Sequence, residues 1–143
     1  MLQRVLYVSR AAPGVDLPQV YEIIRTSHPM NSARGLSGAL LFLDGWFAQV
    51  IEGSAGAVDA AFTRIRADRR HSCPGLRLRS TALGRLFPGQ AMALRYRACL
   101  GGDFLAEFGY RPGFPVADFP ADTLIEVMIG ACRRNEMHLA AAR

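Results

Sequence analysis

The sequence predicts an α+β domain of the ferredoxin-like kind, in which a β-α-β-β-α-β-β chain forms one sheet. The first observation behind this prediction is a period of two in short apolar segments, which is typical of strands. The second is the helical period of the apolar residues in the longer segments between them. We expect two helices to cover one face of the sheet, and a C-terminal helical extension to pack on the other face or on a second subunit. Half of the 143 residues are hydrophobic, which is enough for one core.

The first part of the chain is expected to form a strand, a helix and a loop. Residues 4–9 are β-branched and aromatic, as in a buried strand. A helix capped by Asp16 follows, and it should end near Ser27, because Pro29 disfavours a helical residue before it. Residues 29–35 are then a loop.

A hairpin follows this loop. Asp44-Gly45 separates two apolar runs, residues 39–43 and 46–51, which is the strongest short signal for a two-residue hairpin turn. The other expected elements are a helix, two strands and two further helices: residues 55–67, 76–81, 92–97, 103–108 and 120–142. In the first of these strands leucine and arginine alternate, so we expect the leucines on one face and the arginines on a wet face.

Charge and composition argue against several classes of protein. The formal net charge is +5, every basic residue is arginine, and the arginines make no long basic run. A nucleic-acid partner is not expected, also because the central strands lack an aromatic platform. No apolar run is long enough to span a membrane and the N-terminus does not resemble a signal peptide, so we expect a cytoplasmic protein. The three cysteines lack CxxC spacing, which argues against a disulfide framework and a metal site.

Gln49 is a primary amide in the middle of an otherwise apolar strand. Its donors and acceptors need partners, because an unpaired buried amide costs about 1–3 kcal/mol. If the first strand and the hairpin lie side by side, Tyr7 becomes its neighbour, and Asn31 can point into the same cleft. A neutral tyrosine can release an electron and a proton together, and an amide can exchange its donor and acceptor ends by rotating. Each residue can also have a purely structural role: Tyr7 as a residue of the core, Asn31 as the cap of a loop, and Gln49 as a hydrogen-bonded link between strands.

Several segments resemble the BLUF domain, the family of blue-light sensors that hold a flavin non-covalently. In the order and spacing of the family they are RVLYVSR with Tyr7, the S-x-x-x-N run that ends at Asn31, GLSGALLFLDGWFAQVIEG with Gln49, DRRH at residues 68–71, and the strand that carries Met92. The resemblance covers roughly residues 3–97. The helical tail is similar to that of short, single-domain members. We therefore divide the chain into a flavin-binding domain, residues 1–99, and a C-terminal helical cap or output segment of the same unit, residues 100–143.

The resemblance implies a flavin held between the two helices, either FAD or else FMN or riboflavin. It assigns Asn31 to the edge of the ring and Gln49 to a bridge between the ring and Tyr7. In the family, blue light drives electron and proton transfer from the tyrosine to the flavin, and the glutamine rearranges. The methionine position, here Met92, relays the change to the outer strand.

The resemblance also implies the remaining contacts of the flavin. Asp68, Arg70 and His71 would lie near its ribityl and phosphate end, where a guanidinium offers a fork of donors to phosphate oxygens. Ile23, Ile24, Ser27 and Phe47 complete the implied flavin-binding set. No catalytic residue and no metal ligand are implied.

Two positions depart from the pattern of many family members. Met30 stands where many carry Asn or His, and Gln90 where many carry Trp. We hypothesise that this second glutamine competes for the hydrogen bonds of Gln49.

The expected function is light sensing without catalytic turnover, addressed to a partner protein in trans. The apolar last helix also indicates self-association into a homo-oligomer. The alternatives are a flavin-free ferredoxin-like module for protein interaction or nucleic-acid binding, and a flavin-dependent redox enzyme. The enzyme is disfavoured because the chain has no GxGxxG dinucleotide fingerprint.

Overall fold

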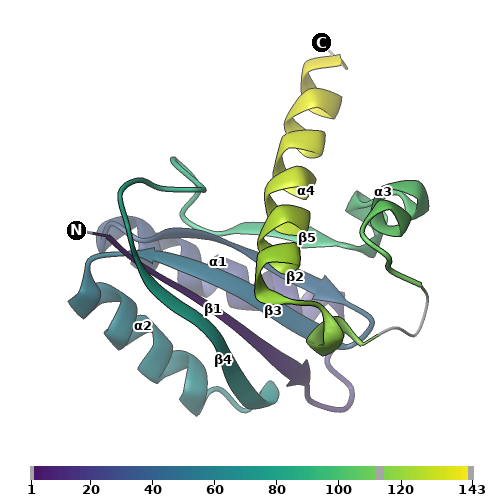
Figure 1. Ribbon diagram of the computed structural model, residues 1–143. Coiled ribbons are helices and arrows are strands. Elements are labelled where there is room, and N and C mark those ends of the chain that lie inside the picture. Colours follow the sequence, from purple (N-terminus) through teal and green to yellow (C-terminus); the bar gives the residue numbers. More distant parts are fainter. Residues whose placement is uncertain (1, 112–114, 142–143) are drawn as a thin grey trace.

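The computed structural model describes residues 2–111 and 115–141, with all of their side chains except those of residues 73 and 134–141. Its centre is a sheet of five strands in the order β4-β1-β3-β2-β5 (Figure 1). The strands are β1 (Leu2–Ala11), β2 (Ser37–Leu43), β3 (Trp46–Gly53), β4 (His71–Ala82) and β5 (Ala93–Tyr96). Neighbouring strands are antiparallel, except that β2 and β5 are parallel. The ferredoxin-like plan with an additional strand is therefore confirmed.

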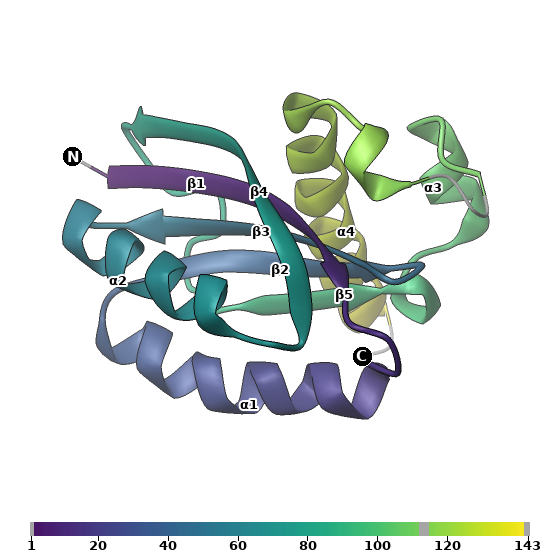
Figure 2. The same ribbon diagram turned by 90° about the horizontal axis from the view of Figure 1, so that it is seen from below.

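Helices enclose the sheet on both faces. One face is covered by α1 (Leu17–Ala33) and α2 (Ala55–Ala67), as Figure 2 shows. The described part of the C-terminal third lies on the other face and contains the 3-10 turn η1 (Arg97–Cys99), α3 (Gly102–Glu107), the 3-10 turn η2 (Val116–Asp118) and α4 (Ala121–Ala141). The predicted packing of the last helix on this face is confirmed, while residue 142, its predicted end, lies outside the described residues. No helix of the described part is both long enough and apolar enough to cross a membrane.

Each face of the sheet has its own core. Leu6 and Val50 belong to the core under α4. Tyr7 and Ile51, their neighbours in the chain, belong to the core formed with α1 and α2. Because side chains alternate between the two faces of a strand, Gln49 lies on the face that α1 and α2 cover.

The turn between β2 and β3 has the two predicted residues. Leu43 pairs with Trp46, so Asp44 and Gly45 connect the strands. Their φ angles are 52° and 81°, and positive values at both positions are what a type I′ hairpin turn requires. The Asp44 carboxylate also accepts a hydrogen bond from Arg97, which ties the turn to η1.

The predicted end of the first helix near Ser27, and the predicted loop at residues 29–35, are wrong. α1 continues for six more residues and has Pro29 inside it. Pro29 is exposed, and the carbonyl four residues earlier, which loses its backbone donor, belongs to another exposed residue and can bond to water. The helix ends at Ala33, and Gly35, just after the C-cap residue Arg34, has a φ of 69°, the left-handed conformation that commonly terminates helices. Asn31 therefore lies on the last turn of a helix and not in a loop.

The prediction that the arginines of residues 76–81 share one solvent-exposed face is wrong, because β4 contains a bulge. The register of β4 against β1 shifts between Leu6, which pairs with Leu78, and Tyr7, which pairs with Leu76. Arg77 is the extra residue at this point. Because directly opposite residues point to the same face, Leu76 and Leu78 lie on opposite faces of the sheet.

Candidate functional site

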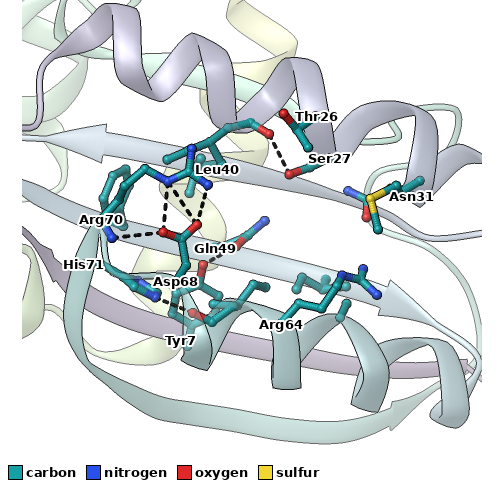
Figure 3. A pocket seen from close by; sticks show the side chains of 16 residues that line it. Tyr7, Thr26, Ser27, Asn31, Leu40, Gln49, Arg64, Asp68, Arg70 and His71 are labelled. Carbon is teal, nitrogen blue, oxygen red and sulfur yellow. Dashed lines mark hydrogen bonds and ion pairs between the residues drawn. The ribbon is translucent and has the colours of Figure 1, made fainter.

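A cavity of about 200 Å³ lies between α1, α2 and the sheet (Figure 3). Its apolar lining consists of Ile23, Met30, Leu40, Phe47, Ile51, Ala61 and Ile65. Its polar lining consists of Tyr7, Thr26, Ser27, Asn31, Gln49, Arg64, Asp68, Arg70 and His71. The cavity thus combines apolar walls with a set of amide, hydroxyl and charged groups, as small-molecule sites do.

Tyr7 and Gln49 are directly opposite each other in the antiparallel pair of β1 and β3. The Tyr7 hydroxyl donates a hydrogen bond to Oε1 of Gln49, and both side chains are buried. At its other end, Nε2 of Gln49 donates to Sδ of Met92 at 3.2 Å. Both ends of the Gln49 amide are therefore hydrogen-bonded. One partner, Tyr7, is on β1, and the other, Met92, lies just before β5.

The environment of Tyr7 keeps its hydroxyl protonated. Burial raises the pKa of this hydroxyl far above its ordinary value, and the nearby carboxylate of Asp68 raises it further. The ring also lies at 5.7 Å from the Phe62 ring and at 6.0 Å from that of His71, measured between centroids. A tyrosine in such a place is a neutral donor over the whole physiological pH range.

His71 connects α2 to β1 at the edge of the cavity. Its Nε2 lies 2.6 Å from the carbonyl oxygen of Ile65, and its Nδ1 lies 2.7 Å from Oγ of Ser9. Because a carbonyl can only accept, Nε2 carries a proton, and in the tautomer protonated only at Nε2 the Nδ1 atom accepts from the serine hydroxyl.

Asp68 and Arg70 form a fork-shaped ion pair at one end of the cavity (Figure 3). Nε of Arg70 lies 2.9 Å and 3.1 Å from the two carboxylate oxygens of Asp68, and Nη2 lies 2.5 Å from Oδ2. The side-chain hydrogen bond from Arg70 is the main cause that lowers the pKa of Asp68, and the bond to Asp68 in turn raises the pKa of Arg70.

Asn31 joins the last turn of α1 to the segment before β5. Its Nδ2 donates to the carbonyl of Ala91 at 3.0 Å, and its own carbonyl accepts from the N–H of Leu36 at 2.9 Å. One turn earlier, Ser27 lines the same cavity while its hydroxyl bonds back to the carbonyl of Ile23 at 2.6 Å.

Most of the predicted site residues meet in this cavity, but two do not line it. The nine that line it are Tyr7, Ile23, Ser27, Asn31, Phe47, Gln49, Asp68, Arg70 and His71. Ile24 packs against the core on this face instead, and Met92 lies behind Gln49, just before β5. Gln90 does not line the cavity either, whereas Met30 does.

Arg64 of α2 is a lining residue that the sequence analysis missed. Burial, and then the charge of Arg34, lower the pKa of its guanidinium. Among the described side chains it has no carboxylate partner, in contrast to Arg70. A signal was present in the sequence, because Ala61, Arg64 and Ile65 recur with helical spacing and continue to Asp68 on one side of α2.

Comparison with known families places these residues in context. A family model described as sensors of blue light using FAD, the BLUF family, matches residues 2–93, which is well over half of the chain. The chain belongs to the BLUF family. The BLUF domain is a blue-light sensor that binds a flavin, so the resemblance inferred from the motifs around Tyr7 and Gln49 is confirmed. The family description is that of a sensor and not of an enzyme, in agreement with the expected lack of catalytic turnover.

Relatives of this BLUF domain include much longer proteins. The photoactivated adenylate cyclase subunit alpha of Euglena gracilis is 35% identical over 65 residues, which are 46% of this chain and 6% of that protein. The subunit beta from the same organism is 34% identical over 71 residues, which are 50% of this chain and 8% of that protein. The chain thus spans less than a tenth of the length of these two relatives, whose cyclase activity is a property of the whole proteins.

Solved structures agree with the fold. BlrB, a BLUF protein in its dark state, is 25% identical and superposes with a TM-score of 0.75 over 91% of this chain and 96% of that chain. The photo-activated state of BlsA gives a TM-score of 0.78 at 20% identity, over 90% of this chain and 92% of that chain. Because BlsA is only 20% identical, its similarity to this chain concerns the fold alone.

Proposed function

We propose that this chain senses blue light with a flavin held between α1 and α2, and that Tyr7 and Gln49 convert the light reaction into a change of hydrogen bonds. The observation that carries the proposal is the buried Tyr7–Gln49 pair at the wall of the cavity. A phenol donates to an amide oxygen there, so the loss of one proton reverses the direction of the hydrogen bond.

The residues that line the cavity suit a flavin in shape and in polarity. Apolar side chains from both helices and from the middle strands can pack on the faces of a flat aromatic ring. Asn31 and Gln49 carry amides that can pair with the polar edge of such a ring. Arg64 and Arg70 offer guanidinium groups to the phosphates of FAD, the flavin that we propose. Arg70 already shares its charge with Asp68, so Arg64 is the cation with the greater need of an anion.

The light reaction follows from the states that Tyr7 can adopt. When bound, the flavin supplies the absorption of blue light and an acceptor for one electron and one proton. A neutral, buried phenol releases both together, because ionising first would place an uncompensated charge in the core. The oxygen of Tyr7, once without its proton, can only accept a hydrogen bond. The amide of Gln49 then turns Nε2 toward it, and this rotation withdraws Nε2 from Sδ of Met92.

The output is proposed to reach a partner protein in trans through the segment around Met92 and through α4. A partner must bind the dark and lit forms with different affinity, since equal affinity shifts no population. The same proposal divides the chain into a flavin-binding domain, residues 1–99, and an output segment, residues 100–143. It also includes assembly of a homo-oligomer through α4 and a location in the cytoplasm.

An absorption spectrum of the purified protein before and after blue light tests this function. A yellow protein whose spectrum shifts reversibly to longer wavelength supports the sensor. A yellow protein that bleaches only when a reducing substrate is added would indicate a redox enzyme. A colourless protein that takes up no added FAD, FMN or riboflavin would favour a flavin-free module for interaction or nucleic-acid binding.

A further inference from the structure

Glu52 of β3 carries a fully buried carboxylate that is surrounded by hydrogen-bond donors. The residues paired with it on the two neighbouring strands donate hydrogen bonds to this carboxylate. Arg4 on β1 donates from Nε and Nη2, each at 3.2 Å, and Ser37 on β2 donates from Oγ at 2.9 Å. The backbone N–H groups of Leu86 and Phe87 donate to its two oxygens at 3.0 Å and 2.8 Å. No other carboxylate of the described side chains is so deeply buried.

These bonds fix one end of the connection between β4 and β5. A buried charge persists only when it is paired and hydrogen-bonded, so the carboxylate and its donors hold one another in place. Arg85 adds three further hydrogen bonds, from Nη1 to Oγ of Ser37 at 2.7 Å and to the backbone carbonyl of Glu52 at 3.3 Å, and from Nη2 to the carbonyl of Gly35 at 2.8 Å. Residues 85–87 are thereby anchored beside the N-terminal end of β1 (Figures 1 and 2).

The other end of the same connection contacts two residues that line the cavity, Asn31 and Gln49. The carbonyl of Gln90 accepts from the N–H of Gly38 at 3.0 Å, and the next carbonyl, that of Ala91, accepts from Nδ2 of Asn31 at 3.0 Å. The residue after it, Met92, accepts from Nε2 of Gln49 at 3.2 Å. Three successive residues therefore present an acceptor to β2, to α1 and to the amide of Gln49.

The two ends lie on different faces of the sheet. Glu52 and Gln49 are three residues apart on β3 and so point to opposite faces. Phe87, next to the carboxylate, belongs to the core under α4, whereas Met92 belongs to the core with α1 and α2. The few residues between them pass from one face to the other, with both ends fixed by hydrogen bonds.

We propose that Glu52 is a positioning residue of the light switch: it holds residues 85–92 so that the carbonyl of Ala91 and the sulfur of Met92 face Asn31 and Gln49. This inference rests on the proposed function, because it concerns the surroundings of the Gln49 amide. Glu52 acts through the connection and does not touch the cavity. A loosened connection lets the sulfur withdraw, so the dark orientation of the Gln49 amide loses the partner that stabilises it.

The test compares Glu52→Gln with the wild type in the rate of dark recovery after blue light. Gln has the shape of Glu, but its NH₂ group faces donors where a carboxylate oxygen accepted. We expect bound flavin, an unchanged dark spectrum and recovery about tenfold slower, because the Nε2–Sδ hydrogen bond that re-forms as the amide returns to its dark orientation is weakened. Asp59→Asn, which removes an exposed carboxylate paired with Arg79 on another part of the surface, should recover at the wild-type rate.

A double-mutant cycle with Met92→Leu separates positioning from a general loss of stability. If Glu52 acts through Met92, Glu52→Gln changes the recovery rate by less than about twofold in the Met92→Leu background. Equal slowing in both backgrounds overturns the proposal, and so does wild-type recovery in the single variant. If the wild type itself shows no reversible shift, the proposed function fails and not this inference alone.

Arg85→Gln covers the outcome in which Glu52→Gln does not fold. Arg85 is exposed, and its substitution removes three hydrogen bonds of the same connection without leaving a buried charge unpaired. Recovery about threefold slower than wild type supports the positioning role; the effect is smaller because the hydrogen bonds from Leu86 and Phe87 to the Glu52 carboxylate remain. Recovery at the wild-type rate overturns it.

Discussion

The Tyr7 hydroxyl donates to Oε1 of Gln49 across the β1–β3 pair, while Nε2 of the same amide donates to Sδ of Met92. The phenol O–H donates to the oxygen end of the amide, which leaves the nitrogen end for the sulfur of Met92. In the proposed switch, the loss of the Tyr7 proton reverses this orientation and so changes the partner of a residue on the connection to β5.

Gln49→Leu should abolish the light response without abolishing flavin binding. Leucine fills a similar volume in an apolar strand, but offers no acceptor to Tyr7 and no donor to Met92. We expect a yellow protein with no reversible shift under blue light, measured by absorption spectroscopy. Gln3→Leu, the same change elsewhere in the sheet, is the control and should keep the full shift. A normal shift in Gln49→Leu would show that another residue is the switch.

The ion pair of Asp68 and Arg70 should stabilise the protein only above acidic pH. Since Arg70 lowers the pKa of Asp68 in the folded state, the stabilisation is complete above the unfolded value of about 3.9 and is lost as pH falls through the lower folded value. The pair is partly exposed, so we expect Asp68→Asn to cost about 1 kcal/mol or less near neutral pH. Thermal unfolding of both proteins measures this. A difference in stability that stays constant down to about pH 2 contradicts the assignment.

Arg64→Gln should weaken binding of phosphorylated flavins more than binding of riboflavin. Arg64 lines the cavity and has no carboxylate partner among the side chains that the structure describes, so a phosphate would supply the missing anion. We expect the Kd of FAD and FMN to rise about tenfold and that of riboflavin to change little, as titrations followed by flavin fluorescence would show. Arg66→Gln, on the same helix and stacked on Phe62, is the control. Equal weakening for all three flavins would place Arg64 against the ring instead.

Gly38→Ala should disrupt the sheet beside the site. A Cβ at this position would lie 1.9 Å from the backbone oxygen of Val50, and a backbone atom of a central strand cannot move away cheaply. We expect a loss of about 3 kcal/mol or more in urea unfolding. Gly56→Ala in α2, where a Cβ meets open space, should instead stabilise by about 0.5–1 kcal/mol. Equal stability of the two variants would contradict the close approach of β2 and β3.

The central pairing could be predicted from the sequence because each step depends on local patterns. The Asp44-Gly45 turn sets the register of β2 and β3, and alternation then decides which residues share a face. The single amide in an apolar strand is visible without any structure. Tyr7 on the first strand follows once that strand lies beside β3.

The features that the sequence did not reveal depend on contacts between distant segments. Pro29 favours a helix end locally, but α1 continues because its inner side packs on the sheet and its proline faces water. The bulge at Arg77 exists only in the pairing of β4 with β1. Arg64 was missed because an arginine on a helix is normally a solvated residue, and only the position of α2 over the sheet turns it toward a cavity.

The difference spectrum of Tyr7→Phe, recorded before and after blue light beside the wild type, tests the account most directly. The substitution removes one oxygen, the donor to Gln49, and leaves the ring that packs against Phe62. Tyr21→Phe, at an exposed tyrosine on α1, controls for the loss of a phenol elsewhere. The account predicts that wild type and Tyr21→Phe shift reversibly to longer wavelength, while Tyr7→Phe binds flavin and shows no shift. A reversible shift of wild-type size in Tyr7→Phe would contradict it.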